Sequence, residues 1–391
     1  MHVAFTPAQA ALQGEIAAYF ARIITPERRE ALRPHVATPL YREVVRQMGN
    51  DGMLALSWPI EYGGRGYGPV EQLIFVREAL RSGAPLPFLT LSTVGPTLMR
   101  YGSEAQKAKF LPAIAEGRCL FSVGYTEPGS GTDLASLQTR AVRDGEDFVV
   151  NGNKIYTSLV EGADYIWLAV RTDPAARKHE GISLLIVDVA TPGFSFTPID
   201  TVAGMHTNST YYSDVRVPAD MLVGGENEGW RLITSQLNFE RVGIAARSIY
   251  GEELYRRVFA WARETVRDGA PVADKPGVRH LLAKTYARLE LLWLLNFRMA
   301  WKLSSGAADP GLASAAKLHG VESMIEVCRD MLQIVGSGGL IRHGSAAAAA
   351  LGGDIEAEYR RCQNATFGGG SAEMMREIVA QRSLGMPRVV R

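Results

Sequence analysis

Apolar side chains recur at helical spacing through the first 120 residues, with Gly- and Pro-rich breaks between the segments. The segment FTPAQAALQGEIAAYFARII predicts a helix with Thr6 as its N-cap and a proline at its first position. VEQLIFVREALRSG predicts a helix that ends at Gly83, and SEAQKAKFLPAIAEG predicts a helix capped by Ser103. We therefore expect an N-terminal helical domain over residues 1–120.

Near residue 121 the pattern changes to short runs rich in β-branched and aromatic residues. EDFVVNGNKIYTS predicts two strands that turn at Asn151-Gly152, a dipeptide typical of two-residue hairpins. DYIWLAVRT, GISLLIVDVA, GFSFTPI and TYYSDVRVP predict further strands. Nothing between them has the length of a crossover helix, so we expect a mostly antiparallel sheet over residues 121–226.

The helical period returns at Trp230 and persists to about residue 335. Turn-rich breaks interrupt it, and the low-complexity loop GSAAAAALGGD precedes the final helices. The sequence thus predicts an α+β protein: an N-terminal helical domain, a middle antiparallel β domain, and a C-terminal four-helix bundle over residues 227–391.

Composition narrows the class of protein. A net charge of +1 without a dense Lys/Arg run argues against a nucleic-acid-binding protein. No uninterrupted apolar run is long enough to span a bilayer, and we see no signal-peptide pattern. The three cysteines are far apart, and the seven histidines show no ligand spacing, so we expect neither a disulfide framework nor a metal site. A cytoplasmic protein fits these features.

Two stretches that could carry chemistry lie in the β domain. YTEPGSGTD, residues 125–133, combines Gly, Pro and short hydroxyls, so its backbone can approach a flat or phosphorylated ligand closely. NGNKIYTS ends in Tyr156, Thr157 and Ser158, an aromatic followed by hydroxyls that suits a planar heterocycle. Taken alone, an ordinary surface turn and an ordinary sheet tyrosine are the alternatives.

A third stretch, WRLITSQLNFERVGIAA, places charged residues on the apolar face of a predicted helix. Its apolar stripe runs through Trp230, Ile233, Leu237 and Ile244. Glu240 falls on the same face, with Arg241 next to it. A buried carboxylate often serves as a base, since burial raises its pKa unless it is paired. A structural Glu–Arg ion pair is the alternative.

Two Gly-rich turns lie in the C-terminal part. TFGGGSAEMMRE, residues 366–377, predicts a helix N-terminus whose free N–H groups attract phosphate. LQIVGSGGL, residues 332–340, is a second turn of this kind. Neither follows a strand of a βαβ unit, so neither is a dinucleotide fingerprint or a P-loop.

Together, the order and spacing of these stretches resemble the acyl-CoA dehydrogenase family over nearly the whole chain. YTEPGSGTD is similar to the family signature after the first helical domain, and VVNGNKIYTS to the hairpin that follows. YSDVRVPADMLVG resembles the exit from the β domain, and LQIVGSGGL and FGGGSAEMMRE resemble the flavin-contacting turns of the bundle. The resemblance implies an FAD enzyme that converts an acyl-CoA thioester to the 2-enoyl-CoA. It also implies a homotetramer or a heterotetramer with a related chain, and an electron-transfer flavoprotein as acceptor.

The resemblance implies roles for individual residues. Glu240 matches the base of members that carry it on a bundle helix directly before an Arg, and the substrate would contact Thr132, Phe239 and Arg241. The residues implied to bind FAD are Tyr125, Thr126, Gly131, Thr132, Tyr156, Thr157, Ser158, Gln333, Gly336, Ser337, Ser371 and Glu373. The five from the bundle would reach the FAD of a neighbouring subunit.

The chain also departs from the family pattern. Tyr156 stands where Trp is commonest, and Gly369 stands where the family most often has its catalytic Glu. ETVRDGAPVAD lacks the Phe of an Arg/Phe pair that grips FAD, which leaves Arg267 as a match. HTN at His206 and FGGGS resemble a branch acting on bulky substrates, including sterol side chains. The alternatives are a partner chain of a heteromeric dehydrogenase that binds no flavin itself, and a flavin monooxygenase or oxidase on the same scaffold.

Overall fold

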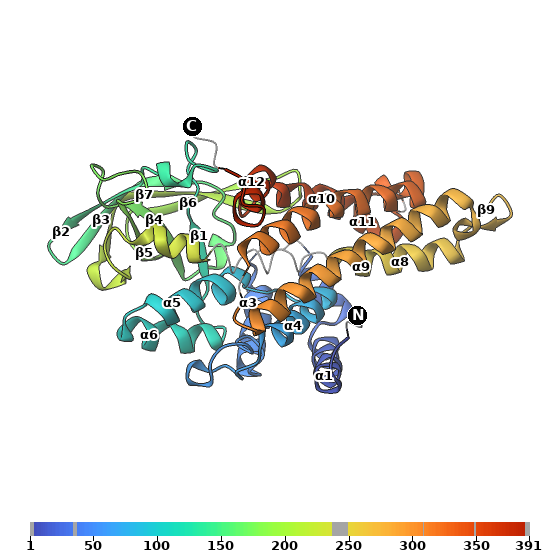
Figure 1. Cartoon of the computed structure of the whole chain (residues 1–391), viewed down its shortest axis with the longest axis horizontal. Helices are drawn as coiled ribbons and strands as arrows, with labels where there is room; N and C mark the ends of the chain where they lie inside the picture. Colours follow the sequence, from blue (N-terminus) through green and yellow to red (C-terminus); the bar gives the residue numbers. More distant parts are fainter. Residues whose placement is uncertain (1–3, 34–36, 237–248, 308, 348, 388–391) are drawn as a thin grey trace.

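The chain folds into an N-terminal group of helices, a β sheet and a C-terminal group of long helices, the order that the sequence predicts. The computed structural model describes residues 4–33, 37–236, 249–307, 309–347 and 349–387. Figure 1 shows the sheet at one end, the C-terminal helices extending to the other end, and the N-terminal helices beneath. The predicted α+β class with these three parts is confirmed.

The N-terminal helices begin where short side chains can cap them. Thr6, Thr25 and Thr38 each precede a proline, and each hydroxyl accepts a hydrogen bond from the backbone N–H three residues on. Ser103 caps a later helix in the same way and forms a capping box with Gln106. These helices are α1 (Pro7–Ile23), α2 (Pro26–Ala31), α3 (Pro39–Asn50), α4 (Pro69–Ser82), α5 (Gly95–Tyr101) and α6 (Glu104–Ala115).

The middle part is one sheet of eight strands that is mostly antiparallel, as predicted. The strands are β1 (Phe121–Gly124), β2 (Arg140–Asp144), β3 (Asp147–Lys154), β4 (Tyr165–Arg171), β5 (Ile182–Asp188), β6 (Phe194–Asp200), β7 (His206–Pro218) and β8 (Leu222–Val223). Their order is β6-β7-β3-β2-β4-β5-β8, and β1 pairs with β4. The pairings of β4 with β1 and β2 are parallel and the others are antiparallel.

The predicted hairpin turn at Asn151-Gly152 is wrong. β3 continues through both residues, and the chain turns earlier, between Asp144 of β2 and Asp147 of β3, which pair with each other. Gly152 lies where the register of β3 shifts against β7, and a Cβ there would come within 2.7 Å of the Cα of Thr139. The glycine therefore permits a bulge and a close backbone approach rather than a turn.

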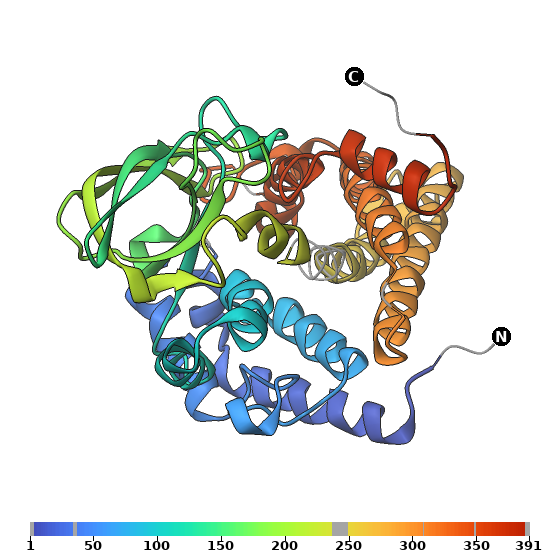
Figure 2. The same cartoon turned by 60° about the vertical axis from the view of Figure 1, so that its left-hand side comes forward.

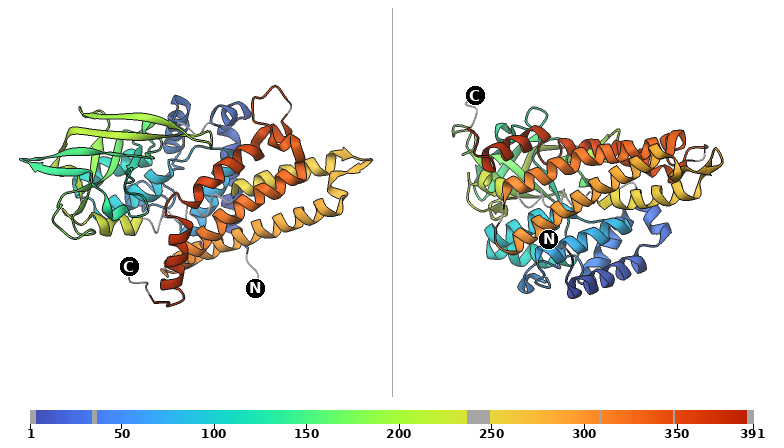
Figure 3. Two further views of the ribbon diagram at one scale, coloured as in Figure 1. Left: turned by 90° about the horizontal axis from the view of Figure 1, so that it is seen from above. Right: turned by 45° about the vertical axis from the view of Figure 1, so that its right-hand side comes forward.

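Helices return after the sheet. They are residues 229–236, α8 (Ile249–Glu264), α9 (Pro276–Ser304), α10 (Pro310–Val335), α11 (Asp354–Cys362) and α12 (Ala372–Arg382). α10 packs against α8, α9, α11 and α12. A short ribbon of β9 (Val266–Arg267) and β10 (Ala270–Pro271) joins α8 to α9. Figure 3 shows this ribbon at the end of the helices that lies far from the sheet.

The helix at residues 229–236 lies between the sheet and the N-terminal helices (Figure 2). Its Leu232 and Ile233 share one hydrophobic core with Trp167 of β4 and with the N-terminal helices. Phe148 and Val150 of β3 belong to a separate core on the other face of the sheet. The helix at residues 229–236 is thus anchored on both the β domain and the N-terminal domain.

Candidate active site

The loop at residues 125–133 is held by a buried ion pair. Lys154, at the end of β3, is 0% exposed, and its Nζ lies 2.8 Å from Oε1 of Glu127. The same Nζ donates to the carbonyl oxygen of Tyr125 at 3.1 Å. Glu127 also accepts hydrogen bonds from the backbone N–H groups of Gln138 and Thr139 at 2.7 and 2.8 Å. The loop backbone is therefore fixed from the inside, whereas Gly129, Gly131 and Thr132 are exposed on the outside.

The two charges of this pair shift each other's titration. Burial lowers the pKa of Lys154 to about 8, although the Glu127 carboxylate acts against this shift. Burial alone would raise the pKa of Glu127, but the Lys154 ammonium and the hydrogen bonds from Thr139 lower it overall. Near pH 7 both groups are therefore charged.

The segment after β3 presents Tyr156 to solvent in an unusual backbone conformation. Tyr156 is 61% exposed and has φ 63°, in the left-handed region that a tyrosine seldom adopts. Thr157 beside it is fully buried, and its N–H donates to the carbonyl oxygen of Asn208 at 3.0 Å. The Ser158 hydroxyl lies 3.1 Å from that of Thr207. These contacts fix the backbone immediately after Tyr156.

The HTN stretch supplies these contacts from β7. The Asn208 side-chain amide donates to the carbonyl oxygen of Thr157 and to Oε1 of Glu161, both at 3.0 Å. The backbone N–H of Ile155 donates to the carbonyl oxygen of Thr126 at 2.8 Å. The segment with Tyr156 is therefore hydrogen-bonded to the 125–133 loop on one side and to β7 on the other.

The Gly-rich turn after α10 lies at the far end of the C-terminal helices. Gln333 and Ser337 are exposed there, and Gly336 has φ 75°. Arg267 of the β9–β10 ribbon donates to the carbonyl oxygen of Val335 at 3.0 Å, and its guanidinium lies over the Trp261 ring at 5.1 Å. The structure therefore joins Arg267 to this turn, at the end of the C-terminal helices that lies away from the sheet and from the segment after β3 (Figure 1).

The second Gly-rich turn is held by a buried lysine. Lys317 of α10 is 1% exposed, and its Nζ donates to the carbonyl oxygens of Gly368 and Gly370 at 2.7 and 2.5 Å. Ser371 caps α12 by accepting from the N–H of Met374, as expected for a helix N-terminus after glycines. Backbone and Ser371 hydrogen bonds lower the pKa of the exposed Glu373 at this terminus.

Three of the predicted substrate and catalytic residues, Phe239, Glu240 and Arg241, lie outside the described residues. Thr132 and Gly131 are exposed on the 125–133 loop. The structure thus brings together the β-domain half of the predicted site.

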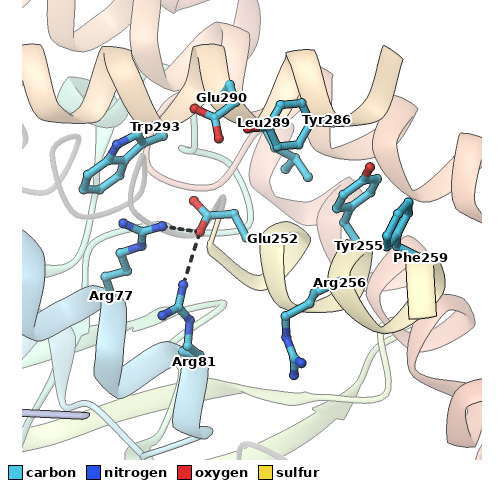
Figure 4. Close-up of a pocket in the computed structure, with 10 residues that line it drawn as sticks. All are labelled: Arg77, Arg81, Glu252, Tyr255, Arg256, Phe259, Tyr286, Leu289, Glu290 and Trp293. Atoms are coloured by element: carbon cyan, nitrogen blue, oxygen red, sulfur yellow. Dashed lines mark hydrogen bonds and ion pairs between the residues drawn. The ribbon is translucent and has the colours of Figure 1, made fainter. Parts of the chain in front are cut away.

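A pocket of about 250 Å³ lies elsewhere, where α4 meets α8 and α9. Figure 4 shows Glu252 between Arg77 and Arg81, with the Nη2 atoms 2.7 and 3.6 Å from its Oε2. The Arg77 guanidinium lies 4.0 Å from the Trp293 ring centroid. None of the residues lining this pocket belongs to the predicted site. Its ion pairs tie the N-terminal helices to the C-terminal ones.

Sequence reasoning missed the supporting residues Glu127, Lys154 and Asn208. A lysine in a strand and a glutamate in a loop usually face water, and no local pattern pairs residues 27 positions apart. One signal was present: Lys154 follows the two-residue period of the buried Phe148 and Val150. A charged residue at an inward position calls for a buried partner.

The 125–133 loop, Tyr156 and the two Gly-rich turns can be compared with known proteins. Family models described as the N-terminal, middle and C-terminal domains of acyl-CoA dehydrogenase match residues 6–118, 122–215 and 227–384. "Acyl-CoA dehydrogenase FadE26" and "Acyl-CoA dehydrogenase FadE29", both of Mycobacterium tuberculosis, are each 48% identical to this chain, with 100% of both chains covered.

Solved structures agree with these matches. "Crystal structure of the ChsE4-ChsE5 complex from Mycobacterium tuberculosis" has 48% identity and a TM-score of 0.94, over 100% of both chains. "Tcur3481-Tcur3483 steroid ACAD" has 48% identity and a TM-score of 0.95, again over 100% of both chains.

Among the described residues, no helix is both long and apolar enough to cross a membrane.

Proposed function

The chain belongs to the acyl-CoA dehydrogenase family and is an oxidoreductase that acts on acyl-CoA, and we propose that it holds FAD against Tyr156 and the 125–133 loop. Enzymes of this family are generally FAD-dependent. The observation that carries the proposal is Tyr156, an aromatic side chain that is 61% exposed at φ 63°. Residues held in a strained backbone conformation by the surrounding structure cluster at active sites and ligand-binding sites.

The residues around Tyr156 fit a flavin. The ring offers a flat surface for stacking, and the exposed Ser158 hydroxyl lies two residues further on. On the adjoining loop, Thr126 and Thr132 would supply hydroxyl groups. Gly131 has no side chain, so the flavin could approach the backbone closely there. Tyr125 and the buried Thr157 would not stack on the flavin. Their hydrogen bonds to the surrounding fold would hold the residues that contact it.

We assign the remaining contacts to a neighbouring subunit. Gln333, Gly336 and Ser337, with Arg267, lie at the far end of the C-terminal helices, where a second chain's FAD could meet them. Ser371 and Glu373 at the start of α12 belong to the same proposed set. A complete site then needs two chains.

The chemistry follows from one acid–base group and one acceptor. Glu240 would take the α-proton of the thioester, and the electron pair left behind would form the α,β double bond as the β-hydride departs. FAD, when bound, accepts that hydride. Phe239, Arg241 and Thr132 would contact the substrate. Support for Glu240 comes from the sequence, because it precedes Arg241 and because Gly369 stands at the family's other base position.

The relatives suggest the substrate class and the assembly. The solved complexes that resemble this chain at 48% identity are each named for two chains, and one is called a steroid ACAD. We propose that this chain acts on a bulky, steroid-linked acyl-CoA as part of a heterotetramer with a related chain, and that an electron-transfer flavoprotein reoxidises it. A homotetramer, and a role as the flavin-free partner chain, are the alternatives.

Replacing the proposed base tests this function directly. Glu240→Gln keeps the size of the side chain but cannot take a proton, so anaerobic bleaching of the flavin by an acyl-CoA should slow by roughly 10²–10⁴-fold. Glu264→Gln, at an exposed glutamate of α8, is the matched control and should bleach like the wild type. Stopped-flow absorbance, read beside FAD content and a thermal melt, gives the comparison.

The outcomes separate the alternatives. Near-normal bleaching in a soluble, FAD-loaded Glu240→Gln protein would rule out this base. Lost stability with normal bleaching would identify Glu240 as the structural partner of Arg241. A wild-type chain that is colourless alone but becomes yellow when its partner chain is added would favour the heteromer. Rapid reoxidation of the reduced flavin by air would favour an oxidase.

A further inference from the structure

Gln236 is the last described residue of the helix at residues 229–236, and its side chain is almost completely buried. It is 1% exposed and lies where this helix meets Tyr125, the first residue of the 125–133 loop. Tyr125 in turn contacts Trp167 of β4. Gln236 therefore touches the loop that forms one wall of the proposed site.

The hydrogen-bond chemistry fixes which way the Gln236 amide points. The indole Nε1 of Trp167 can only donate, and it donates to the Tyr125 hydroxyl oxygen at 3.1 Å. The Tyr125 hydroxyl donates its own proton to Oε1 of Gln236. The amide oxygen is thus occupied by Tyr125, and the Nε2 group points away from that bond.

Nε2 of Gln236 is buried, and no acceptor for it is present in the part of the chain that the structure describes. A buried amide donor without an acceptor is destabilising, so proteins rarely keep one unless a ligand or another group satisfies it. Leucine would fill the same space without that cost. A glutamine here therefore indicates an oxygen acceptor that arrives with a ligand.

We propose that Gln236 Nε2 donates a hydrogen bond to an oxygen of the bound acyl-CoA and so helps to determine which acyl-CoA binds well. This inference rests on the proposed function. The 125–133 loop that Gln236 contacts through Tyr125 also carries Thr132, which the proposed function assigns to the substrate. The acyl-CoA is therefore the ligand that we expect to supply the acceptor. Thr126, the next residue of the loop, remains assigned to FAD.

Two substitutions of Gln236 separate the donor from the rest of the side chain. Gln236→Glu keeps the acceptor for the Tyr125 hydroxyl but removes the Nε2 donor, whereas Gln236→Leu removes both. Thr234→Val, at an exposed residue of the same helix, is the control. The measurement is an anaerobic titration of the flavin-loaded protein, with its partner chain if FAD binding needs one, against acyl-CoA thioesters that bleach the wild type.

Both Gln236 variants should keep FAD but need about 5- to 100-fold more acyl-CoA for half-maximal bleaching, the range expected when one buried hydrogen bond to a ligand is lost. The limiting bleaching rate should change much less, because the bond is made in the ground state as well. Thr234→Val should stay within about twofold of the wild type.

Half-saturation within twofold of the wild type in Gln236→Leu would overturn the inference. Loss of the fold in both variants would also overturn it, because the amide would then be structural. If no acyl-CoA bleaches the wild type, the proposed function itself fails, which is a different result from bleaching that Gln236 does not influence.

Discussion

Tyr156 combines two features that are unfavourable in free energy: a left-handed backbone conformation and an exposed aromatic ring. Its left-handed backbone conformation costs roughly 1–3 kcal/mol for a residue with a side chain. Its ring is exposed although the neighbouring Thr157 is fully buried. Hydrogen bonds between Asn208 and Thr157 and between Thr207 and Ser158 fix the backbone next to Tyr156, so the surrounding fold maintains this arrangement before any ligand binds.

We predict that Tyr156→Ala weakens FAD binding by roughly 1–3 kcal/mol, the loss expected for a stacking aromatic. Tyr156→Phe keeps the ring and should bind FAD almost as the wild type does. Fluorescence titration of the apoprotein with FAD measures both. Tyr211→Ala, at a 40%-exposed tyrosine of β7, is the control and should leave FAD affinity unchanged. Equal affinity in Tyr156→Ala and wild type would show that the flavin does not stack here.

Residues whose roles depend on near neighbours could be predicted from the sequence. Thr6 and Ser103 act on backbone groups three positions away, and Gly83 has φ 83° at the end of its own helix. Lys154 and Gln236 could not be predicted, because their partners are brought together only by the sheet and by the packing of a distant helix. Local chemistry therefore identifies caps and loops, whereas buried polar pairs require the fold.

At the scale of elements, the Glu127–Lys154 pair joins the 125–133 loop to the end of β3. The Asn151-Gly152 prediction failed for a related reason. The dipeptide satisfies the local rule for a turn, but β3 pairs with β7 on both sides of it, so the chain passes through as a bulge. Long-range pairing overrides local preference in both places. The loop's shape consequently depends on a contact between elements, and that contact can be tested.

We predict that Lys154→Met lowers the free energy of unfolding by roughly 3–5 kcal/mol, because it leaves the Glu127 carboxylate buried without its partner. Adding Glu127→Gln to that variant should restore much of the loss, since no uncompensated charge then remains. Urea unfolding of the two single variants and the double variant measures the coupling. Additive losses would show that the two side chains act independently.

The same pair gives the sign of a pH effect. The pKa of Glu127 is lower in the folded state, so its contribution to stability is present above the ordinary pKa of about 4.3 and is lost as the pH falls through the folded-state pKa. Glu127→Gln should therefore flatten the acid side of the stability profile. Lys154, with a pKa of about 8 in the fold, loses its proton earlier than in the unfolded chain, so above that pH its own titration favours folding.

At the scale of the whole molecule, the two groups of residues that we assign to the flavin site lie far apart within one chain. Tyr156 lies on the β domain, whereas Arg267 and the turn at Val335 lie at the far end of the C-terminal helices (Figures 1 and 3). Arg77 and Glu252 fix the N-terminal helices on that long C-terminal group (Figure 4). This separation within one chain is consistent with the proposal that a neighbouring subunit completes each site.

The long helix α9 offers a surface for such an assembly. Its exposed apolar side chains are Tyr286 (53%), Leu291 (45%), Leu294 (43%) and Trp301 (60%). Other side chains of α9, such as Leu289 and Leu292, are buried in the core of its own chain. Apolar residues on both faces of a helix indicate a second packing partner.

We therefore predict that Leu294→Lys, which places a charge among these apolar side chains, shifts the protein toward smaller species in analytical ultracentrifugation. Because the proposed FAD contacts of Gln333 and Ser337 come from a neighbour, the dissociated protein should also lose FAD while each chain stays folded by circular dichroism. Ile60→Lys, at a 78%-exposed isoleucine of the N-terminal part, is the matched control and should change neither property. Dissociation that leaves FAD affinity intact would mean that one chain completes its own flavin site, and an unchanged oligomer would exclude this face of α9 as the interface.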